Sequence, residues 1–454
     1  MAAPLSLRLA EWLAALEWPA VPPRQRELAS LRVLDTVGLL LGACAGPPAM
    51  IVRERARQSG QGGRSSIVGS GVSVSAGWAA LANGVIAHSL DFDDTFPDSV
   101  VHPGSVIVPV ALAVGEETGA SGRDILTAIA GAYEIAARLA QIGGTQFHAR
   151  GFHASGIFAP LAAAFAAGRL MRLPAASIAS AVGLAASMSG GLLAFTADGA
   201  WSKWLHLGWG GMGGILAAQL AGAGFRGPMG ALDGRHNLYA SFLAGTTPSI
   251  DRADAELGTR WNGDSALFKY YPCAHVIQPY LDLALALRRA HAINPATVRA
   301  VRCAVAPWAV TIVCEPAAEK LHPKSVVEAI ASLRLCVAAA LVDGNVGIEL
   351  LDEGSWRRAD LLAMAQRVDY VADPALAGFA ARLEIEMQDG TRCAQAGDAS
   401  VPDGERLGAK FRALALRALP QDQVARLERA IAGLAEAPSA AEITQPLRRA
   451  AGHP

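Results

Sequence analysis

Apolar runs rich in alanine, leucine and glycine dominate the chain between about residues 28 and 243, and turn signals such as Gly46-Pro47 separate them. Alternation of β-branched residues is scarce in this part of the chain. Alanine has the highest intrinsic helix propensity, and Ser121, with Asp124 three residues later, is placed to cap a helix. The pattern therefore predicts an α-helical first half.

The pattern changes in the last third of the chain, where apolar and polar residues alternate. Residues 301–305 alternate in this way, and residues 383–387 do so shortly before the turn pair Asp389-Gly390. A period of two is typical of a strand, and Asp-Gly between two such segments predicts a hairpin. We expect a smaller α+β domain in which helices such as residues 325–341 pack on a short antiparallel sheet.

The predicted fold class is mainly α, with a large all-helical domain and a smaller α+β domain. The chain has 454 residues, more than one hydrophobic core usually serves, so two domains are expected. Helical periodicity returns after Gly404, which indicates that the C-terminal segment rejoins the helical domain. The predicted domains are residues 1–273 with 399–454, and residues 274–398.

Composition and charge narrow the choice of partners. Hydrophobic residues make up 52% of the chain and charged residues 17%, which is typical of a protein with a large packed core. The 39 basic and 40 acidic residues give a net charge of -1. This balance argues against nucleic acid or an anionic membrane as a partner that is recognised by bulk charge.

Two apolar segments have the length or position of export or membrane signals. Residues 1–19 carry acidic residues within their apolar run and no basic cluster before it, so they predict an amphipathic helix. Residues 173–197 lack charge and are long enough to span a bilayer, but Pro174 and Gly190-Gly191 favour a helix buried in a large core. The six cysteines show no CxxC spacing, which indicates reduced thiols. We expect a cytoplasmic protein with no membrane partner.

The densest polar cluster is the segment HSLDFDDT at residues 88–95, which is followed by HPG at residues 102–104. Carboxylates and histidines in an apolar neighbourhood cost desolvation energy unless they are solvated, paired or functional. His102 precedes Pro-Gly, so a loop would hold it near the carboxylates, and we expect it to belong to a site. For Asp93 and Asp94, capping or bracing of the loop is as compatible with the sequence as a role in a site.

Three further motifs contain candidate residues. His153 in GFHASG lies at or just before a helix start, where backbone N–H groups favour an anion; a histidine satisfied by nearby backbone is the alternative. Lys203 and Lys269 are flanked by aromatic residues, which can hold an ammonium partly desolvated beside a substrate carboxylate; a snorkelling surface lysine is the alternative. Cys273 lacks an accompanying oxyanion motif, so a packed thiol is favoured over a nucleophile.

The ordered set of motifs resembles the MmgE/PrpD family, which includes 2-methylcitrate dehydratase, cis-aconitate decarboxylase and iminodisuccinate epimerase. The set runs HSLDFDDT, HPG, GFHASG, DGAWSKWLH, FKYYPCAH and then SVVEA leading to AAALVDG, and the resemblance covers about residues 28–390. It implies a helical domain with an α+β lid, a homodimer, and catalysis without a metal or other cofactor. Carried over by position, the catalytic and substrate-binding residues are Asp91, Thr95, His102, His153, Lys203, Lys269 and His275.

One position departs from the family pattern. Many members carry a tyrosine in the helix before LVDG, whereas Leu335 stands at the matching position here. The missing phenol removes a candidate proton donor or carboxylate ligand. The departure therefore argues against transfer of the decarboxylase activity.

The resemblance implies a lyase, first of all a 2-methylcitrate dehydratase-like hydro-lyase that removes a proton beside a carboxylate of a small di- or tricarboxylic acid. An epimerase of an amino or imino dicarboxylate and a cis-aconitate decarboxylase-like enzyme are the alternatives. Lys203 and Lys269 would bind and polarise carboxylates. Thr95 and His275 are the other residues expected to bind the substrate. His102 or His153 would take the proton, and Asp91 would orient one of these histidines.

Two readings from other classes compete with a lyase. The aspartates of residues 93–98 superficially fit a Mg²⁺-binding motif of terpene synthases. No companion metal motif accompanies them, and an aromatic content of 6% offers little to surround a carbocation. A non-catalytic binding protein that kept the fold is the other possibility.

Overall fold

The computed structural model describes residues 3–244, 248–250 and 253–450. Its internal contacts divide the chain into two compact units. Unit 1 consists of Met1–Ser89, Asp93–Ala266 and Gly404–Pro454, and unit 2 of Leu90–Phe92 and Leu267–Asp403. The chain is 60% helical with 9% strand, which confirms the predicted mainly α fold class. The domain boundaries given above, at residues 273/274 and 398/399, stay a prediction.

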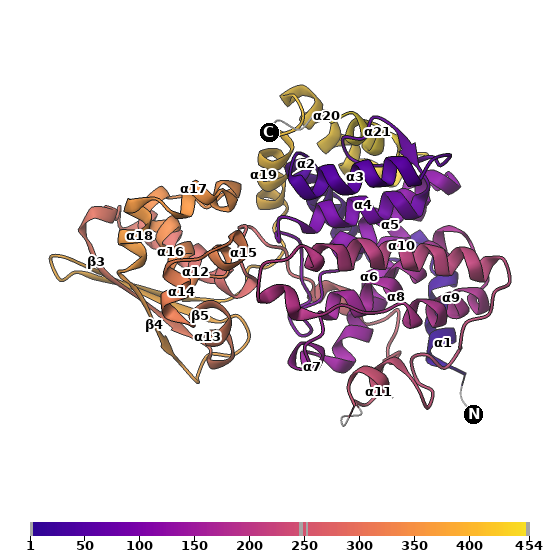
Figure 1. The fold of residues 1–454 in the computed structure, drawn as a ribbon, viewed down its shortest axis with the longest axis horizontal. Coiled ribbons are helices and arrows are strands. Elements are labelled where there is room, and N and C mark those ends of the chain that lie inside the picture. The colour runs from indigo at the N-terminus through magenta and orange to yellow at the C-terminus, as the bar shows by residue number, and fades with distance from the viewer. Residues whose placement is uncertain (1–2, 245–247, 251–252, 451–454) are drawn as a thin grey trace. The chain divides into compact units, whose positions relative to one another are not determined.

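Unit 1 is a bundle of helices with one short strand pair (Figure 1). Its α-helices and strands are α1 (Leu5–Ala15), α2 (Pro23–Ala43), α3 (Pro47–Ser59), β1 (Ser65–Ser66), β2 (Ser73–Val74), α4 (Ala76–His88), α5 (Gly104–Thr118), α6 (Gly122–Gly143), α7 (Gln146–Ala149), α8 (Ala154–Leu170), α9 (Ala175–Ser187), α10 (Ser202–Gly222), α11 (Leu238–Phe242), α19 (Gly404–Ala415), α20 (Gln421–Ala432) and α21 (Ala441–Arg449). Its 3₁₀ turns are η1 (Trp18–Ala20), η2 (Leu193–Thr196), η3 (Asn262–Ser265) and η7 (Leu434–Glu436).

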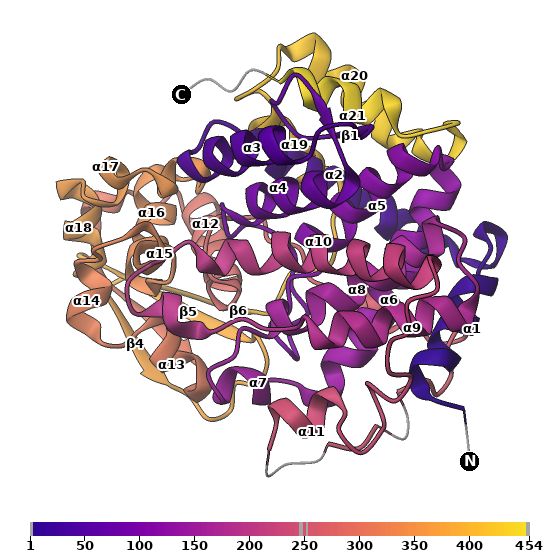
Figure 2. The same cartoon turned by 45° about the vertical axis from the view of Figure 1, so that its right-hand side comes forward.

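Helix α10 lies at the centre of unit 1, where it packs against α4, α5, α8 and α9 (Figure 2). Glycines on α10 allow this close packing. A side chain on Gly208 would overlap the backbone of α4 at Leu81, and a side chain on Gly214 would overlap α8 at Ala163. The small residues on α10 therefore allow α4 and α8 to pack closely against it.

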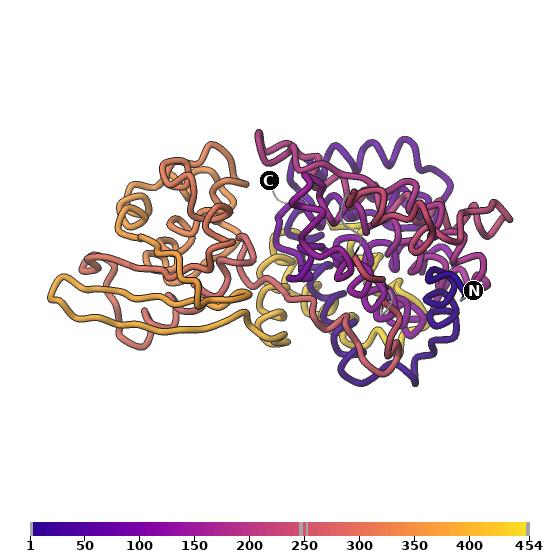
Figure 3. Tube along the Cα trace, turned by 90° about the horizontal axis from the view of Figure 1, so that it is seen from below, coloured from indigo at the N-terminus to yellow at the C-terminus, as the bar shows by residue number. Residues whose placement is uncertain are grey.

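The C-terminal helices pack within unit 1. Helix α19 lies against α2, and Figure 3 traces this late segment (yellow) among the N-terminal helices (indigo). The buried ammonium of Lys410 is 2.6 Å from Asp35 Oδ1, so a buried ion pair ties α19 to α2. Burying such a pair costs desolvation free energy for both charges, and removal of either partner would leave an uncompensated charge in the core.

Unit 2 combines helices with a four-stranded sheet in the order β4-β3-β5-β6. Its elements are η4 (His275–Ile277), α12 (Gln278–Ala290), η5 (Pro295–Thr297), β3 (Val298–Val305), α13 (Pro307–Val313), α14 (Ala317–Leu321), α15 (Val326–Ile330), α16 (Leu333–Asp343), η6 (Ile348–Leu351), α17 (Glu353–Trp356), α18 (Ala359–Ala365), β4 (Val368–Ala372), β5 (Ala381–Met387) and β6 (Arg392–Gly397). The predicted hairpin is β5–β6, and Gly390 in its turn has φ +86°, a left-handed conformation that glycine adopts without strain.

The sheet differs in one respect from the predicted antiparallel one. Strands β3, β5 and β6 are antiparallel neighbours, with Val301 opposite Ile385. Strand β4 is parallel to β3, and Val301 pairs there with Val368. Most residues of β4 are not buried, so its sequence lacks the clear apolar alternation that would have predicted a strand.

The predicted helix over residues 325–341 was wrong as a single element. The segment forms two helices, α15 and α16, with an interruption between them. The Ser332 hydroxyl caps the start of α16 by accepting a hydrogen bond from the N–H of Leu335. Serine favours caps because its side chain competes with the helix backbone for hydrogen bonds. By contrast, the prediction for Ser121 and Asp124 is confirmed, since they form a capping box at the start of α6.

Among the described residues, one helix is long and apolar enough to cross a membrane by length and composition. This helix is α6, and 89% of its apolar window is buried inside the structure; α2 and α3 pass the same test together but bend by 98° between them. A core helix passes such a test as readily as a span does. The charge-free residues 173–197, predicted to form one buried helix, instead contain α9 and the separate 3₁₀ turn η2.

Candidate active site

The loop between α4 and α5 folds back on itself and brings the polar residues of its two ends together. Helix α4 ends at His88, and α5 begins at Gly104. Between them, Phe96 and Val101 form an antiparallel bridge in which the N–H of Phe96 donates to the Val101 carbonyl over 2.8 Å. This reversal returns His102 toward the residues that follow His88.

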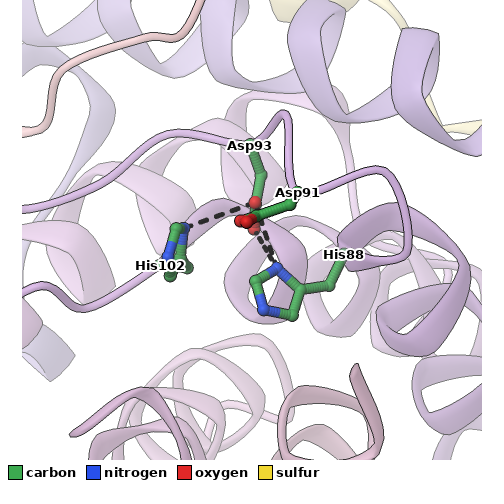
Figure 4. A group of neighbouring side chains, drawn as sticks. All are labelled: His88, Asp91, Asp93 and His102. Carbon is green, nitrogen blue, oxygen red and sulfur yellow. Dashed lines mark hydrogen bonds and ion pairs between the residues drawn. The ribbon is translucent and has the colours of Figure 1, made fainter. Parts of the chain in front are cut away.

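Asp93 is the centre of the resulting cluster. Its Oδ2 lies 2.9 Å from His88 Nδ1 and accepts a hydrogen bond of 2.6 Å from the Ser105 hydroxyl. Its Oδ1 lies 3.3 Å from His102 Nδ1. Figure 4 shows both imidazoles turned toward this carboxylate, which is drawn there together with Asp91 of the same loop. All three hydrogen-bonding partners of Asp93 are buried, so the carboxylate is held in one orientation.

The protonation states of this cluster follow from burial and charge. Burial acts to raise the pKa of the Asp93 carboxyl, but His88 and His102 outweigh burial and hold this pKa well below its usual value. Burial lowers the pKa of His88 to about 4, although Asp93 opposes that shift. At neutral pH, His88 is therefore a neutral imidazole that donates Nδ1–H to an ionised Asp93. Its Nε2 is buried and has no hydrogen-bond partner among the residues that the structure describes.

His102 is held by the same loop but is more accessible than His88. Its Nδ1 lies 3.1 Å from the Asp94 carbonyl and 3.2 Å from Thr95 Oγ1. Its backbone N–H donates to Ser155 Oγ of α8 over 3.1 Å. The side chain of His102 is 6% exposed, whereas that of His88 is 0% exposed. His102 is therefore the more accessible of the two imidazoles.

A second pair of histidines lies on the other side of His88. His153 occupies the N-cap position before α8, as the sequence indicated, and its ring is stacked on that of His88 with centroids 6.1 Å apart and planes at 17°. Its Nδ1 lies 3.0 Å from the Nδ1 of His206, which is on α10. Burial lowers the pKa of His153 well below its usual value and also lowers the pKa of His206. No carboxylate takes part in this histidine pair among the described contacts.

Lys203 supplies a positive charge to the same region. It is half-buried near the start of α10, three residues before His206. Its charge contributes to the lowered pKa values of His88, His148 and His153, after burial as the largest cause. Lys203 is thus close enough to act on groups from α4, α7 and α8, and it could pair with a substrate carboxylate.

Asp94, next to Asp93, faces different surroundings. Its Oδ2 accepts a hydrogen bond of 2.7 Å from the Tyr133 hydroxyl of α6, and its Oδ1 accepts one of 2.9 Å from the N–H of Gly104. The guanidinium of Arg32, from α2, lies 3.7 Å from the Tyr133 ring centroid. Burial raises the pKa of Asp94 to about 7. Asp94 therefore braces the loop against α5 and α6, which is the bracing role that the sequence left open.

The remaining predicted site residues belong to unit 2. The buried Lys269 Nζ donates to the Asp91 carbonyl over 2.6 Å and lies 3.1 Å from Asp91 Oδ1. Asp91 has φ +49°, a left-handed conformation that aspartate tolerates better than most residues. His275 stacks on Phe379, with ring centroids 5.0 Å apart. Cys273 is fully buried beside Gln278, and burial raises its pKa well above the usual value, as expected of a packed thiol.

The structure brings four of the predicted residues together in unit 1, namely Thr95, His102, His153 and Lys203. Asp93 supplies the carboxylate that holds His88 by a hydrogen bond, and the orienting role expected of Asp91 toward His102 or His153 stays a prediction. His88 and His206 also belong to the cluster, although neither was predicted from the sequence as a site residue. His88 is five residues before Asp93 in a cluster that was recognised, so its position was a usable signal, whereas the direction of its ring was not visible in the sequence.

The cluster also contains residue types that bind transition metals. The candidate ligand atoms of His88, Asp93 and His102 lie within 4.8 Å of one another. In the described arrangement both imidazoles direct Nδ1 at the carboxylate, and Ser105 donates to it as well. A bound metal would have to replace these hydrogen bonds, because a histidine nitrogen must be unprotonated to ligate.

Fold and site together define a mainly helical protein with a buried ionised aspartate, several histidines and a nearby lysine. The MmgE/PrpD N-terminal domain matches residues 7–251, and the MmgE/PrpD C-terminal domain matches residues 271–436. The chain belongs to the MmgE/PrpD family. The predicted family is thereby confirmed.

Curated relatives of the chain are named as enzymes. It is 27% identical over 368 residues to cis-aconitate decarboxylase of Mus musculus, which covers 77% of this chain and 74% of the relative. It is 26% identical over 390 residues to cis-aconitate decarboxylase of Homo sapiens, with 82% and 79% covered. It is 24% identical over 304 residues to cis-aconitate decarboxylase of Aspergillus terreus, with 63% and 60% covered. The predicted enzyme class, a lyase or isomerase of this family, is confirmed.

Proposed function

We propose that this protein is a lyase that acts on a small di- or tricarboxylic acid by moving a proton at a carbon beside a carboxylate. The observation that carries the proposal is the buried carboxylate of Asp93 with the Nδ1 atoms of His88 and His102 against it. A carboxylate at Nδ1 fixes the tautomer of an imidazole and stabilises the imidazolium that forms when Nε2 accepts a proton.

A proton on carbon beside a carboxylate is weakly acidic, so its removal needs a base and a nearby positive charge. His102 is the best placed base, because it lies against Asp93 and is the more accessible of the two imidazoles. Lys203 supplies the positive charge that would bind the substrate carboxylate and stabilise the enediolate. Thr95, at His102 Nδ1, would help to hold that ring in place.

Two reactions are favoured by different observations. The neutral resting state of His88 and His153 suits a reaction that begins with removal of a proton, as dehydration of a 2-methylcitrate-like hydroxy acid or epimerisation does. The relatives named as cis-aconitate decarboxylases favour decarboxylation. In that reaction the C–C bond to the departing CO₂ breaks, and a protonated histidine must deliver a proton to the carbon. Dehydration remains our first proposal.

A substrate panel in D₂O, followed by NMR, separates these reactions. Dehydration of 2-methylcitrate yields an alkene, decarboxylation of cis-aconitate yields a product that has lost one carbon and gained deuterium, and epimerisation exchanges a carbon-bound proton for deuterium. We expect turnover of at least one di- or tricarboxylate. Binding of the acids without turnover or deuterium exchange would contradict the proposal and favour a binding protein.

Substitutions test the assigned roles on the substrate so identified. We expect His102→Ala to lower kcat about 10²-fold or more, the usual scale for an acid–base group. Lys203→Met should raise KM as well as lower kcat, because it removes a carboxylate partner. His236→Ala, which changes an exposed histidine of the same unit, is the matched control and should leave turnover unchanged. Normal turnover in His102→Ala would overturn the role of this cluster.

The proposal extends to Lys269, Asp91 and His275 of unit 2, which the family resemblance assigns to the same reaction. We expect Lys269→Ala to lower turnover about 10²-fold or more. Because Lys269 is buried and bonded to Asp91, circular dichroism and the thermal midpoint must be compared with those of the parent chain. A folded Lys269→Ala variant with near-normal turnover would exclude this residue from the reaction.

We also propose a homodimer, a cytoplasmic location and activity without a metal or other cofactor. The first is measured by light scattering of the purified chain. The last predicts that a chelator such as EDTA leaves turnover unchanged. Loss of activity with EDTA and recovery with a divalent ion would instead favour a metal at the Asp93 cluster.

A further inference from the structure

The pair formed by His153 and His206 lies beside the Asp93 cluster and lacks a carboxylate among the described contacts. His153 is 2% exposed, whereas His206 is only half-buried. Their Nδ1 atoms are 3.0 Å apart, which is hydrogen-bond distance. His206 was not among the residues assigned to the site from the sequence, so its partnership with His153 is an observation of the structure.

A hydrogen bond between two imidazole nitrogens constrains both rings. One nitrogen must carry the hydrogen, and the other must accept with its lone pair. Two neutral imidazoles joined through Nδ1 therefore have opposite tautomers, with Nδ1–H on one ring and Nε2–H on the other. The ring with Nδ1–H keeps its Nε2 lone pair and is the one that can act as a base there.

The surroundings are shaped to hold the two rings in this arrangement. Phe195 lies with ring centroids 5.4 Å from His153 and 6.2 Å from His206. Gly191 accepts the backbone N–H of His153, and a side chain at Gly191 would come within 3.2 Å of the His206 ring. Gly191 also has φ +140°, which other residues rarely adopt. Close approach of the His206 ring therefore depends on glycine at this position.

We propose that His206 is a positioning residue that accepts Nδ1–H from His153 and thereby keeps His153 Nε2 available as a base. Its half-buried location lets the Nε2–H of His206 be satisfied by water, at no cost to the more buried ring. The charged or titratable groups that act on His153 are His88 of α4, His102 of the loop, Lys203 of α10 and His148 of α7. The proposal rests on the proposed function and extends it, since it adds His153 beside His102 as a group that takes part in proton transfer.

The direct test is the tautomer of His153 itself, read by ¹⁵N NMR of histidine-labelled protein. We expect Nδ1 of His153 to be protonated in the parent chain and the two tautomers to mix in His206→Ala. In His206→Asn the amide oxygen can accept the same hydrogen, so the parent tautomer should return. His236→Ala serves to control for labelling and fold. An unchanged His153 tautomer in folded His206→Ala would overturn the proposal.

Kinetics supply the second readout. We expect His206→Ala to lower kcat about 10-fold to 100-fold and to displace the pH profile of kcat, as loss of a histidine-orienting partner does elsewhere. His206→Asn should recover most of the rate and the parent profile. Equal loss in both variants with an unmoved pH profile would indicate a merely structural role and overturn the proposal. The NMR result does not depend on turnover, so failure of the proposed function and failure of this inference remain distinguishable.

Discussion

Two neighbouring aspartates, Asp93 and Asp94, face opposite regions of unit 1 and behave differently. Both are buried and lie on the same loop. Asp93 points at His88 and His102, while Asp94 accepts a hydrogen bond from Tyr133, under the guanidinium of Arg32. The pKa of Asp93 is held well below its usual value, whereas that of Asp94 is raised to about 7. Burial acts on both in the same direction, so the partners decide the outcome.

The difference separates a site residue from a structural one. Asp93 remains an anion that can stabilise an imidazolium, which is what a proton-transfer site needs. Asp94 has hydrogen bonds from Tyr133 and Gly104 and no histidine at its carboxylate among the described contacts. Its part is to anchor the loop that presents Asp93. Sequence position alone does not distinguish the two roles, because the two aspartates are adjacent and the direction of each side chain decides which partners it meets.

The largest expected effect comes from Asp93→Asn. The substitution keeps the shape of the side chain but removes the charge that orients His88 and His102. We expect kcat to fall about 10³-fold or more, the scale seen when a buried carboxylate partner of a catalytic histidine is neutralised. The measurement is single-substrate kinetics on the acid identified by the substrate panel.

Asp94→Asn is the matched control for this variant, since it makes the same chemical change at the adjacent position. We expect it to retain turnover within about 10-fold, because the new amide can still accept from Gly104 and donate to the Tyr133 oxygen. Comparable losses in both variants would mean that the loop acts as a unit. In that case the distinction between the two aspartates would fail.

The second prediction concerns stability and pH at Asp94. An unfolded aspartate titrates near 3.9, whereas Asp94 titrates at about 7 in the fold. Between these values the folded state holds a proton that the unfolded state has lost, so the free energy of unfolding falls as pH rises through this window. From about pH 5.5 to pH 8 this loss is about 2 kcal/mol, and Asp94→Asn should escape it.

The measurement is the urea midpoint of the parent chain and of Asp94→Asn at both pH values. Other groups titrate in this range, but they are common to both proteins and cancel in the difference. The Asp94→Asn variant should gain stability relative to the parent as pH rises. A difference that stays constant between the two pH values would show that Asp94 is not protonated in the folded chain.

Much of the fold was predictable because it follows from local patterns. Alanine-rich periodic runs predicted the helices of unit 1, and the alternation before Asp389-Gly390 predicted the hairpin β5–β6. Two elements escaped prediction for physical reasons. Strand β4 lies at an edge with few buried residues, and Ser332 interrupts an apolar run that otherwise has helical periodicity.

The site was predictable to the level of residue type and segment. His102, Thr95 and His153 stood out because polar residues are costly in an apolar neighbourhood. The partnerships did not stand out, because they depend on side-chain direction across separate elements. His206 of α10 reaches His153 of α8 only through the packing of two helices. Leu335 proved to be fully buried in the apolar core of unit 2, a setting that the sequence did not indicate.

The smallest expected effects come from removing, for each aspartate, the one neighbouring hydroxyl that donates a hydrogen bond to it. Ser105→Ala deletes the 2.6 Å hydrogen bond to Asp93, and Tyr133→Phe deletes the 2.7 Å hydrogen bond to Asp94. We expect Ser105→Ala to lower kcat about 10-fold, since a hydrogen bond to a charged group contributes about 1.5 kcal/mol or more. The free energy of unfolding should fall as well, because the buried Asp93 carboxylate loses one of its hydrogen-bond donors.

Tyr133→Phe should lower the stability without lowering the rate. It leaves Asp94 with one buried acceptor unsatisfied, which costs about 1–3 kcal/mol of unfolding free energy, while the ring stays available to Arg32. Turnover should stay within about 3-fold of the parent, because the hydroxyl lies on the bracing side of the loop. Kinetics and urea midpoints of both variants test the pair together. A rate loss in Tyr133→Phe without a stability loss would place Asp94 in the reaction. Loss of one hydroxyl at Asp94 can lower kcat in a stable protein only if Asp94 acts on the substrate or on Asp93.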